Sequence, residues 1–477
     1  MEIQRPLVKL FTNSGQCYMY DVNKNTIISL KPSQFQALNT FLKSGIKKDE
    51  GDFIEKMTEA GFLSSNRVRE IIHPADELLS FYLENKVKML TFQVTQQCNF
   101  RCEYCVYSGG YENRGHTNKK MQMETLTKGV DFLVEHSRDC KEVFIGFYGG
   151  EPFLEFDLIR QCIEYAKKKA EGKKIRFSVT TNGSIINDGI VSYLAEQDVS
   201  LTISLDGPKE IHDAHRRFAF NNKGTFDEIM KNVRFIQTNY PEYFKKVHIN
   251  AVIDTKCDFS CINKFFNHYE TVRNASLSTS QYSENYSKLD TGIAEDFLIQ
   301  EQYELFKVYY CKIRKIKTRE SSKIMLQEYD ALSRLAEQLK PTDGLPEKYH
   351  HGGPCVPGVQ RLFINADGDL YPCERVSETS DLMRIGHVDT GFDMQKVRRI
   401  LNIGQISEEK CKNCWAIRFC TLCAASVDTT KEFSAEMKSE RCKNVWLAVE
   451  ERMKDYCTLK ELGHPFEEEE FLTPIGE

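Results

Sequence analysis

The sequence lacks long apolar stretches, an excess of positive charge and the apolar segment of a secretion signal. No uncharged apolar run approaches the roughly 20 residues that a membrane-spanning helix needs, so we expect no membrane segment. The formal net charge is −5, which argues against a nucleic-acid partner held by a basic surface. The opening residues, MEIQRPLVKLF, lack the core of a signal peptide, which predicts a cytoplasmic protein.

Cysteine, in contrast, is abundant and clustered. The chain of 477 residues contains 17 cysteines, too sparse for a small disulfide scaffold. Ten of the 17 fall in two groups, between residues 98 and 105 and between residues 355 and 442. Clustered cysteines in a cytosolic protein indicate metal or redox chemistry, whereas we interpret the scattered ones as small buried apolar residues.

Residues 1–88 are predicted to form a small α+β unit. Strands are expected at 7–11, 17–21 and 26–30, followed by helices at 34–42, with Ser33 as its N-cap, and at 52–60. This order of elements fits a winged-helix-like module, and a lid or a dimerisation arm is the alternative.

Residues 89–290 alternate between apolar strands and amphipathic helices. Strands are expected at 89–95, 143–148, 175–181, 200–205, 247–253 and 276–282, and helices at 121–137, 157–171, 188–197, 226–239 and 259–269. Because parallel strands need crossovers of this length, the pattern predicts an α/β fold, a partial (β/α)6 barrel. Ligands would then bind at the carboxyl ends of the strands.

Three further regions complete the predicted organisation. Residues 291–349 are charged and helical and are interpreted as a bridge, and residues 458–477 as an acidic tail. Residues 350–457 are irregular and contain most of the clustered cysteines. A segment with so little periodic apolar pattern needs another source of stability, which metal clusters can supply.

The first cysteine group follows the strand predicted at 89–95. Its loop, CNFRCEYC, contains Cys98, Cys102 and Cys105. Three thiolates can hold three irons of a 4Fe-4S cubane and leave the fourth iron open to an amine and a carboxylate. A zinc site that includes His116 or a disulfide pair is the alternative, although zinc normally takes four nearby ligands.

Together with motifs after the later strands, this loop resembles the CxxxCxxC signature of the radical S-adenosylmethionine (SAM) superfamily. The motifs are GGEP after the second strand, TNG after the third and SLDGP after the fourth. The resemblance implies that an electron from a flavodoxin- or ferredoxin-type donor cleaves bound S-adenosylmethionine to a 5′-deoxyadenosyl radical, which abstracts hydrogen from a substrate carbon. The residues that it assigns to this cofactor are Tyr104, Gly149, Gly150, Glu151, Thr181, Asn182, Ser204, Asp206 and either Arg216 or Arg217.

The second cysteine group resembles the SPASM domain of peptide-modifying radical enzymes. The resemblance implies two auxiliary 4Fe-4S clusters, and therefore three clusters in the chain. Cys411, Cys414, Cys420 and Cys442 would close the distal one, and Cys355, Cys373 and Cys423 would hold the proximal one. The spacing between Cys420 and Cys423 is one residue shorter than usual, and two zinc sites are the alternative.

Seven thiols for eight positions leave one iron of the proximal cluster open, where we expect a substrate thiolate to bind. Glu374 follows Cys373 where sulfatase-maturing relatives place an acidic base, although a surface carboxylate is an equal interpretation. The predicted activity is therefore thioether formation in a ribosomally made, Cys-rich precursor peptide. The leader segment of this precursor would bind the winged-helix-like module of residues 1–88 as an added strand. Carbon–carbon crosslinking or formylglycine formation is the nearest alternative, and a non-catalytic iron–sulfur protein is a more distant one.

Overall fold

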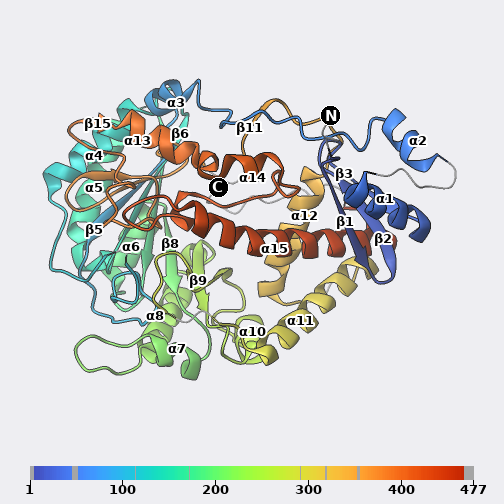
Figure 1. The fold of residues 1–477 in the computed structure, drawn as a ribbon. Coiled ribbons are helices and arrows are strands. Elements are labelled where there is room, and N and C mark those ends of the chain that lie inside the picture. The colour runs from blue at the N-terminus through green and yellow to red at the C-terminus, as the bar shows by residue number, and fades with distance from the viewer. Residues whose placement is uncertain are drawn as a thin grey trace.

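A ten-stranded mixed sheet is the centre of the molecule. The computed structural model describes residues 5–45, 52–112, 114–170, 172–289, 292–316, 320–351 and 355–466. The strand order is β10-β9-β8-β7-β6-β5-β12-β13-β14-β15, and helices cover it as Figure 1 shows. Two smaller sheets, β1-β2-β3 and β11-β4, lie outside it.

The parallel part of the sheet is the predicted α/β region. Its strands are β5 (Met89–Thr95), β6 (Glu142–Gly149), β7 (Lys174–Thr181), β8 (Val199–Ser204), β9 (Val247–Ile253) and β10 (Ser276–Gln281). The crossover helices are α4 (Met123–Glu135), α5 (Phe156–Lys169), α6 (Asp188–Glu196), α7 (Lys209–His215), α8 (Phe226–Asn239), α9 (Pro241–Phe244) and α10 (Phe259–His268). Along β8 and β9, buried and half-buried residues alternate, and the expected strand boundaries agree within about two residues.

Strand β12 (Leu362–Ile364) extends this sheet beyond the region that the sequence predicted. It pairs in parallel with β5, with Phe363 opposite Thr91, and its three residues are buried. Strands β13 (Asp369–Tyr371), β14 (Gly386–His387) and β15 (Gly391–Phe392) then continue it in antiparallel order. The C-terminal cysteine region is therefore joined to the barrel through the same sheet.

The N-terminal unit contains the antiparallel strands β1 (Val8–Asn13), β2 (Gln16–Asp21) and β3 (Thr26–Leu30) and the helices α1 (Pro32–Ser44) and α2 (Phe53–Glu59). The predicted N-cap, Ser33, is wrong: the N-cap is Lys31, because Pro32 takes the first helical position, which needs no backbone N–H. One face of the sheet packs on α1 and α2 through Met19 and Leu38.

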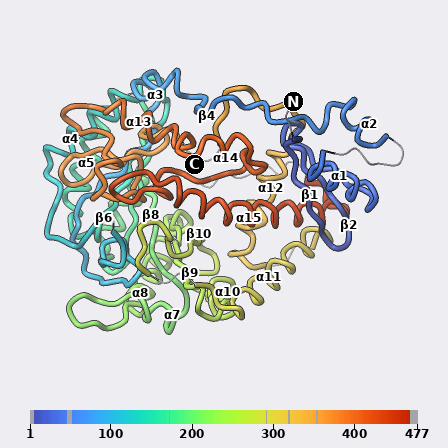
Figure 2. Tube along the Cα trace, viewed as in Figure 1, coloured from blue at the N-terminus to red at the C-terminus, as the bar shows by residue number. Residues whose placement is uncertain are grey.

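The long helix α15 (Ala435–Glu461) connects the two ends of the chain. Its Val449 and Met453 share an apolar core with Phe11 and Tyr20 of the N-terminal sheet. Lys9 of β1 forms an ion pair of 2.7 Å with Glu450. Figure 2 shows α15 crossing the molecule toward β1 and β2.

The remaining helices connect or cover these units. They are α3 (Leu79–Asn85), α11 (Glu295–Arg314), α12 (Lys323–Gln338), α13 (Met394–Leu401) and α14 (Glu408–Lys412), and the short strands β4 (Glu70–Ile71) and β11 (Lys348–Tyr349) pair with each other. Within the described residues, no helix combines the length and the apolar character that crossing a membrane requires.

Candidate functional site

The loop after β5 gathers the first three thiols. Cys98 Sγ accepts a hydrogen bond from Asn182 Nδ2 at 3.7 Å, and Cys105 Sγ accepts one from the backbone N–H of Tyr107 at 3.5 Å. The pKa values of Cys98 and Cys102 are raised to about 12, mainly by burial, and the nearby thiol of Cys105 contributes to both shifts. Three thiols close enough to act on one another's pKa fit a metal site, since a bound cation favours their thiolate form.

His116 was the candidate fourth ligand of a zinc site. Its ring packs against Tyr107, and the contacts described for it are not with these thiols. The two rings stack at 5.5 Å, and His116 Nδ1 lies 3.2 Å from the carbonyl oxygen of Gln96. Burial lowers the pKa of His116. These contacts position the ring, and its buried Nε2 has no hydrogen-bond partner among the described residues.

The structure distinguishes the two candidate arginines. Arg216 is buried, and its Nη1 donates to the hydroxyl of Tyr104 at 2.8 Å and lies 3.5 Å from Asp206 Oδ1. Its Nε has no hydrogen-bond partner, so this buried guanidinium can bind a further acceptor. Arg217 instead directs its Nη1 to the carbonyl oxygen of Asn222 at 3.5 Å. Arg216 is thus the arginine beside the cysteine loop.

Asp206 lies at the carboxyl end of β8 and connects the loop to the sheet. Its Oδ2 accepts a short hydrogen bond from the hydroxyl of Tyr104, and its Oδ1 accepts one from the backbone N–H of Val252 at 3.1 Å. Ser204 is the last residue of β8, two positions earlier. The predicted residues after β5 and β8 therefore meet at one edge of the sheet.

Glu151 of the GGEP segment is fully buried and accepts three hydrogen bonds from the chain. They come from Thr181 Oγ1 at 2.6 Å, from the backbone N–H of Asn182 at 2.7 Å and from that of Phe153 at 3.0 Å. Burial raises the pKa of Glu151, and these hydrogen bonds oppose the rise. Whatever it offers to a ligand, Glu151 holds the ends of β6 and β7 together.

Gly149 and Gly150 allow that segment to approach the end of β5 and the start of the loop that carries the cysteines. A Cβ at Gly149 would lie 2.2 Å from the carbonyl oxygen of Thr95, and one at Gly150 would lie 2.0 Å from that of Gln97. The backbone N–H of Gly150 donates to Thr95 at 2.7 Å. The close approach, together with a φ of +139° at Gly149, explains why two glycines occur here.

The C-terminal region brings Cys355, Cys373 and Cys423 together. The pKa of Cys373 is raised to about 12, mainly by burial, and the charges of Glu374, Cys423 and Cys355 contribute to the shift. Glu374 Oε1 forms an ion pair of 2.8 Å with Arg361. The carboxylate therefore lies beside this three-thiol group with a guanidinium as its partner.

Cys411, Cys414, Cys420 and Cys442 form a separate four-thiol group. Burial raises the pKa of Cys414, and the charges of Cys411 and Cys442 add to the effect. For Cys420 burial raises the pKa to about 12, and Cys414 and Cys442 are among the nearby charges. The indole N–H of Trp446 donates to Cys414 Sγ at 3.3 Å.

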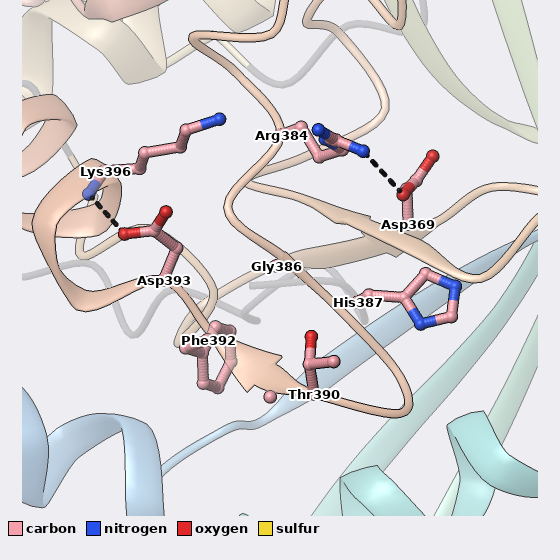
Figure 3. Close-up of a pocket in the computed structure, with 9 residues that line it drawn as sticks. Asp369, Arg384, Gly386, His387, Thr390, Phe392, Asp393 and Lys396 are labelled. Atoms are coloured by element: carbon pink, nitrogen blue, oxygen red, sulfur yellow. Dashed lines mark hydrogen bonds and ion pairs between the residues drawn. The ribbon is translucent and has the colours of Figure 1, made fainter.

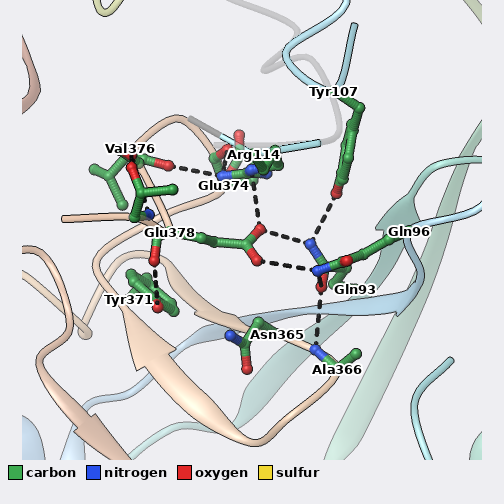
Figure 4. Close-up of polar contacts among 12 residues, drawn as sticks. Gln93, Gln96, Tyr107, Arg114, Asn365, Ala366, Tyr371, Glu374, Val376 and Glu378 are labelled. Carbon is green, nitrogen blue, oxygen red and sulfur yellow. Dashed lines mark hydrogen bonds and ion pairs between the residues drawn. The ribbon is translucent and has the colours of Figure 1, made fainter. Parts of the chain in front are cut away.

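A buried polar network that the sequence analysis missed joins the barrel to the three-thiol region. Arg114 Nε lies 2.9 Å from Glu378 Oε1, and both side chains are buried. Gln93 of β5 donates to Glu378 at 2.6 Å and to the hydroxyl of Tyr107 at 2.8 Å, as Figure 4 shows. Arg114 Nη2 also donates to the carbonyl oxygen of Val376 at 2.7 Å. The one available signal was Gln93, a polar residue in the middle of an apolar strand.

A hollow of about 350 Å³ lies away from all of these groups, on β13 to β15 (Figure 3). It is lined by Asp369, Arg384, His387, Phe392 and Lys396 among others, and Arg384 Nη1 lies 3.6 Å from Asp369 Oδ1. None of the sequence-predicted site residues lines it.

Comparison with known proteins shows what the α/β region is similar to. A family model described as Radical SAM superfamily matches residues 92–254. The chain is 33% identical over 186 residues to a cysteine-type anaerobic sulfatase-maturating enzyme of Clostridium novyi, covering 38% of this chain and 48% of that protein. It is 24% identical over 201 residues to the radical SAM cyclopropyl synthase TigE of Paramaledivibacter caminithermalis, covering 39% and 42% of the two chains. The chain thus spans about half the length of these relatives.

A second comparison extends further along the chain. A cysteine-type anaerobic sulfatase-maturating enzyme of Clostridium perfringens is 23% identical over 369 residues, covering 73% of this chain and 91% of that protein. The solved structure of native anSMEcpe with bound AdoMet and Cp18Cys peptide has a TM-score of 0.59 and 19% identity, covering 79% and 98% of the two chains. The α/β fold with its mixed sheet matches that structure, and the chain is similar in sequence to anaerobic sulfatase-maturating enzymes.

Proposed function

We propose that this protein is a radical SAM peptide maturase that joins a cysteine sulfur to a carbon of another residue in a Cys-rich precursor peptide. The match over residues 92–254 supports the radical SAM assignment. The relatives named as sulfatase-maturating enzymes and as a cyclopropyl synthase support a maturase. A cysteine peptide is bound in the similar solved structure, which supports a peptide substrate.

Residues at the carboxyl edge of the sheet would hold the first cluster and S-adenosylmethionine. Cys98, Cys102 and Cys105 would bind three irons, and Arg216 would donate its unpartnered Nε–H to the methionine carboxylate. When bound and reduced, the cofactor supplies the radical that removes hydrogen from the substrate carbon. The protein's contribution is to orient the peptide and to exclude water.

The observation that carries the thioether proposal is the three-thiol group of Cys355, Cys373 and Cys423. The structure describes all 17 cysteines, and seven of them belong to none of the three thiol groups. None of these seven is among the groups that shift the pKa of Cys355 or Cys373. A cluster held there by three thiols would keep one iron for a substrate thiolate, whose pKa the iron would lower. Glu374 would take a proton at its carboxylate, because Arg361 keeps that carboxylate close to Cys373.

The N-terminal sheet would bind the leader of the precursor. Strands β1 and β3 are the two edges of this sheet, and each pairs with β2. Because α15 lies against β1, the edge at β3 is the one considered for the leader. An extended leader could add to this edge through backbone hydrogen bonds, which tolerate many side chains. The core peptide would then be fed toward the carboxyl ends of the barrel strands.

The test is mass spectrometry of a Cys-rich precursor incubated with the reduced, cluster-loaded protein and S-adenosylmethionine. Each thioether should remove two hydrogens and one alkylatable thiol. Loss of two hydrogens with every thiol still alkylatable would exclude sulfur as the partner. Failure to release 5′-deoxyadenosine from any reduced preparation would exclude the radical activity altogether.

Formylglycine formation is the second candidate. It is favoured by the similarity to cysteine-type sulfatase-maturating enzymes over most of both chains and by the carboxylate of Glu374 directly after Cys373. A sulfatase-derived cysteine peptide distinguishes the two activities. Conversion of its cysteine to an aldehyde that reacts with hydrazides would favour this candidate and count against thioether formation.

A further inference from the structure

Lys438 is a lysine buried beside the four-thiol group. Its side chain is only 1% exposed, and its Nζ lies 3.4 Å from Cys411 Sγ and 3.4 Å from the carbonyl oxygen of Gly404. Burial raises the pKa of Cys420 and of Cys442, and the charge of Lys438 opposes the rise at both. The ammonium group therefore lies within electrostatic range of three of the four thiols.

This buried charge has no carboxylate partner in the part of the chain that the structure describes. An isolated ammonium costs several kcal/mol to remove from water unless an opposite charge compensates it. One carbonyl oxygen at 3.4 Å does not provide that compensation. Four thiolates around a 4Fe-4S core provide it, since the assembly carries about two negative charges when oxidised and three when reduced.

We infer that Lys438 raises the reduction potential of the cluster at Cys411, Cys414, Cys420 and Cys442, so that this cluster accepts electrons readily. The inference rests on the proposed function and on the 4Fe-4S cluster that the resemblance to SPASM domains implies at these four thiols. A fixed positive charge attracts the reduced cluster more strongly than the oxidised one, because reduction adds a negative charge. Reduction at this site is therefore favoured over reduction at a cluster without such a neighbour.

The experiment is a potentiometric titration of the full-length, cluster-loaded protein followed by electron paramagnetic resonance. Lys438→Met should lower the equilibrium constant for one-electron reduction of one cluster at least tenfold, which corresponds to 59 mV. Lys438→Arg keeps the charge and should change it less than threefold. Lys410→Met is the matched control, because exposed Lys410 also acts on Cys442 but donates to Ser439 at the surface; it too should change the constant less than threefold.

Unchanged potentials in Lys438→Met with a full iron content would overturn the inference. Loss of iron from the methionine variant alone would support the electrostatic role, whereas equal loss from the arginine variant would contradict it. A wild-type protein with zinc at these thiols, or with far fewer than about 12 irons, would instead contradict the proposed clusters.

The outer face of α11 carries a second, independent inference. Ile299, Tyr303 and Phe306 are each 61% exposed, and Tyr310 is 47% exposed. With the half-buried Ile313 they follow a spacing of 4-3-4-3, the repeat of a helix that packs along another helix. The opposite face of α11 packs into the core through Phe297, Leu305 and Val308.

We propose that α11 packs antiparallel against α11 of a second copy of this chain. A twofold axis at Phe306 places Tyr303 opposite Tyr310 and Ile299 opposite Ile313. The same register brings the acidic first turn, Glu295 and Asp296, near the basic last turn of the other helix, which includes Arg314. The stripe offers on the order of 500 Å² per copy, somewhat below the roughly 800 Å² of a standard interface, so a moderately stable dimer is expected.

Analytical ultracentrifugation of the full-length protein tests this pairing. Wild-type protein should dimerise, Phe306→Glu should weaken the association at least tenfold, and Phe220→Glu, at another exposed phenylalanine, should not. Reversing the charges of one turn should weaken the dimer, and reversing both turns should restore it. A monomeric wild-type protein at about 50 μM, or wild-type protein that binds lipid vesicles through this stripe instead, would overturn the proposal.

Discussion

The two C-terminal cysteine groups differ in both thiol number and neighbouring charge. The three-thiol group lies beside the carboxylate of Glu374, whereas the four-thiol group lies beside the ammonium of Lys438. Three thiols leave a metal position for a ligand, and a nearby carboxylate can accept that ligand's proton. Four thiols would complete a cluster, and a nearby cation would favour the storage of an electron there. The difference suggests one site for substrate and one for electron transfer.

The largest expected effect tests the division between the barrel and the three-thiol group. Cys102→Ala should lower S-adenosylmethionine cleavage at least about 10³-fold, because an incomplete ligand set does not hold the first cluster. Cys373→Ala should abolish the peptide product and leave cleavage within a few-fold of wild type. Both are measured by chromatography of 5′-deoxyadenosine and of the peptide. The exposed Cys261 provides a silent Cys→Ala control, and equal loss of cleavage in both variants would remove the distinction.

The second-largest effect is expected at Glu374, the carboxylate beside the three-thiol group. Glu374→Gln should slow peptide product formation about 100-fold through loss of a general base, with little change in S-adenosylmethionine cleavage. Asp381→Asn, at an exposed carboxylate bonded to Lys396, is the control. A product rate unaffected by Glu374→Gln would return Glu374 to the role of a surface carboxylate paired with Arg361.

Arg216 and Arg217 provide a matched pair in the barrel. Arg216→Met should weaken S-adenosylmethionine binding about 10- to 100-fold, because hydrogen bonds to a charged group contribute about 1.5–3 kcal/mol. Arg217→Met should change it less than about threefold, since its guanidinium binds a backbone carbonyl. Equilibrium dialysis measures both, and equal losses would contradict the assignment of Arg216.

The smallest effect concerns pH near the four-thiol group. Burial lowers the pKa of His350 to about 4, and its Nε2 accepts the backbone N–H of Gly404 at 3.0 Å. Between pH 4 and 6.5 the unfolded chain binds this proton and the folded chain does not, so stability falls as the pH falls through 6.5. From pH 7 to pH 5 His350 should remove about 2 kcal/mol of unfolding free energy. Denaturant unfolding of His350→Gln should lack that part of the pH dependence, and an identical pH profile would refute it.

Much of the fold was predictable because strand and helix periods are local properties of the sequence. The strand from Val199 to Ser204 alternates in burial and was recognised from its apolar residues alone. The pairing of β12 with β5 was not, since three residues carry no period and their partner lies more than 270 positions earlier. Likewise, cysteine spacing predicted the thiol groups, but only the structure distinguishes Arg216 from Arg217.

Buried charges were the least predictable part of the site. Arg114, Glu378 and Lys438 occur in sequence segments that look like ordinary solvated surface, because nothing local indicates that a distant element covers them. Gln93 was the exception, since a polar residue within MLTFQVT requires an internal partner.

The parallel pairing of β12 beside β5 limits how this gene can be divided. A product ending near residue 290 would leave β5 with unsatisfied backbone groups along one side and would be prone to aggregate through that side. Expression of the barrel alone is therefore expected to give insoluble material, and split or fused versions of the protein should keep residues 89–371 continuous. Evolutionary exchange of the C-terminal half would face the same constraint, since any replacement must bring its own strand.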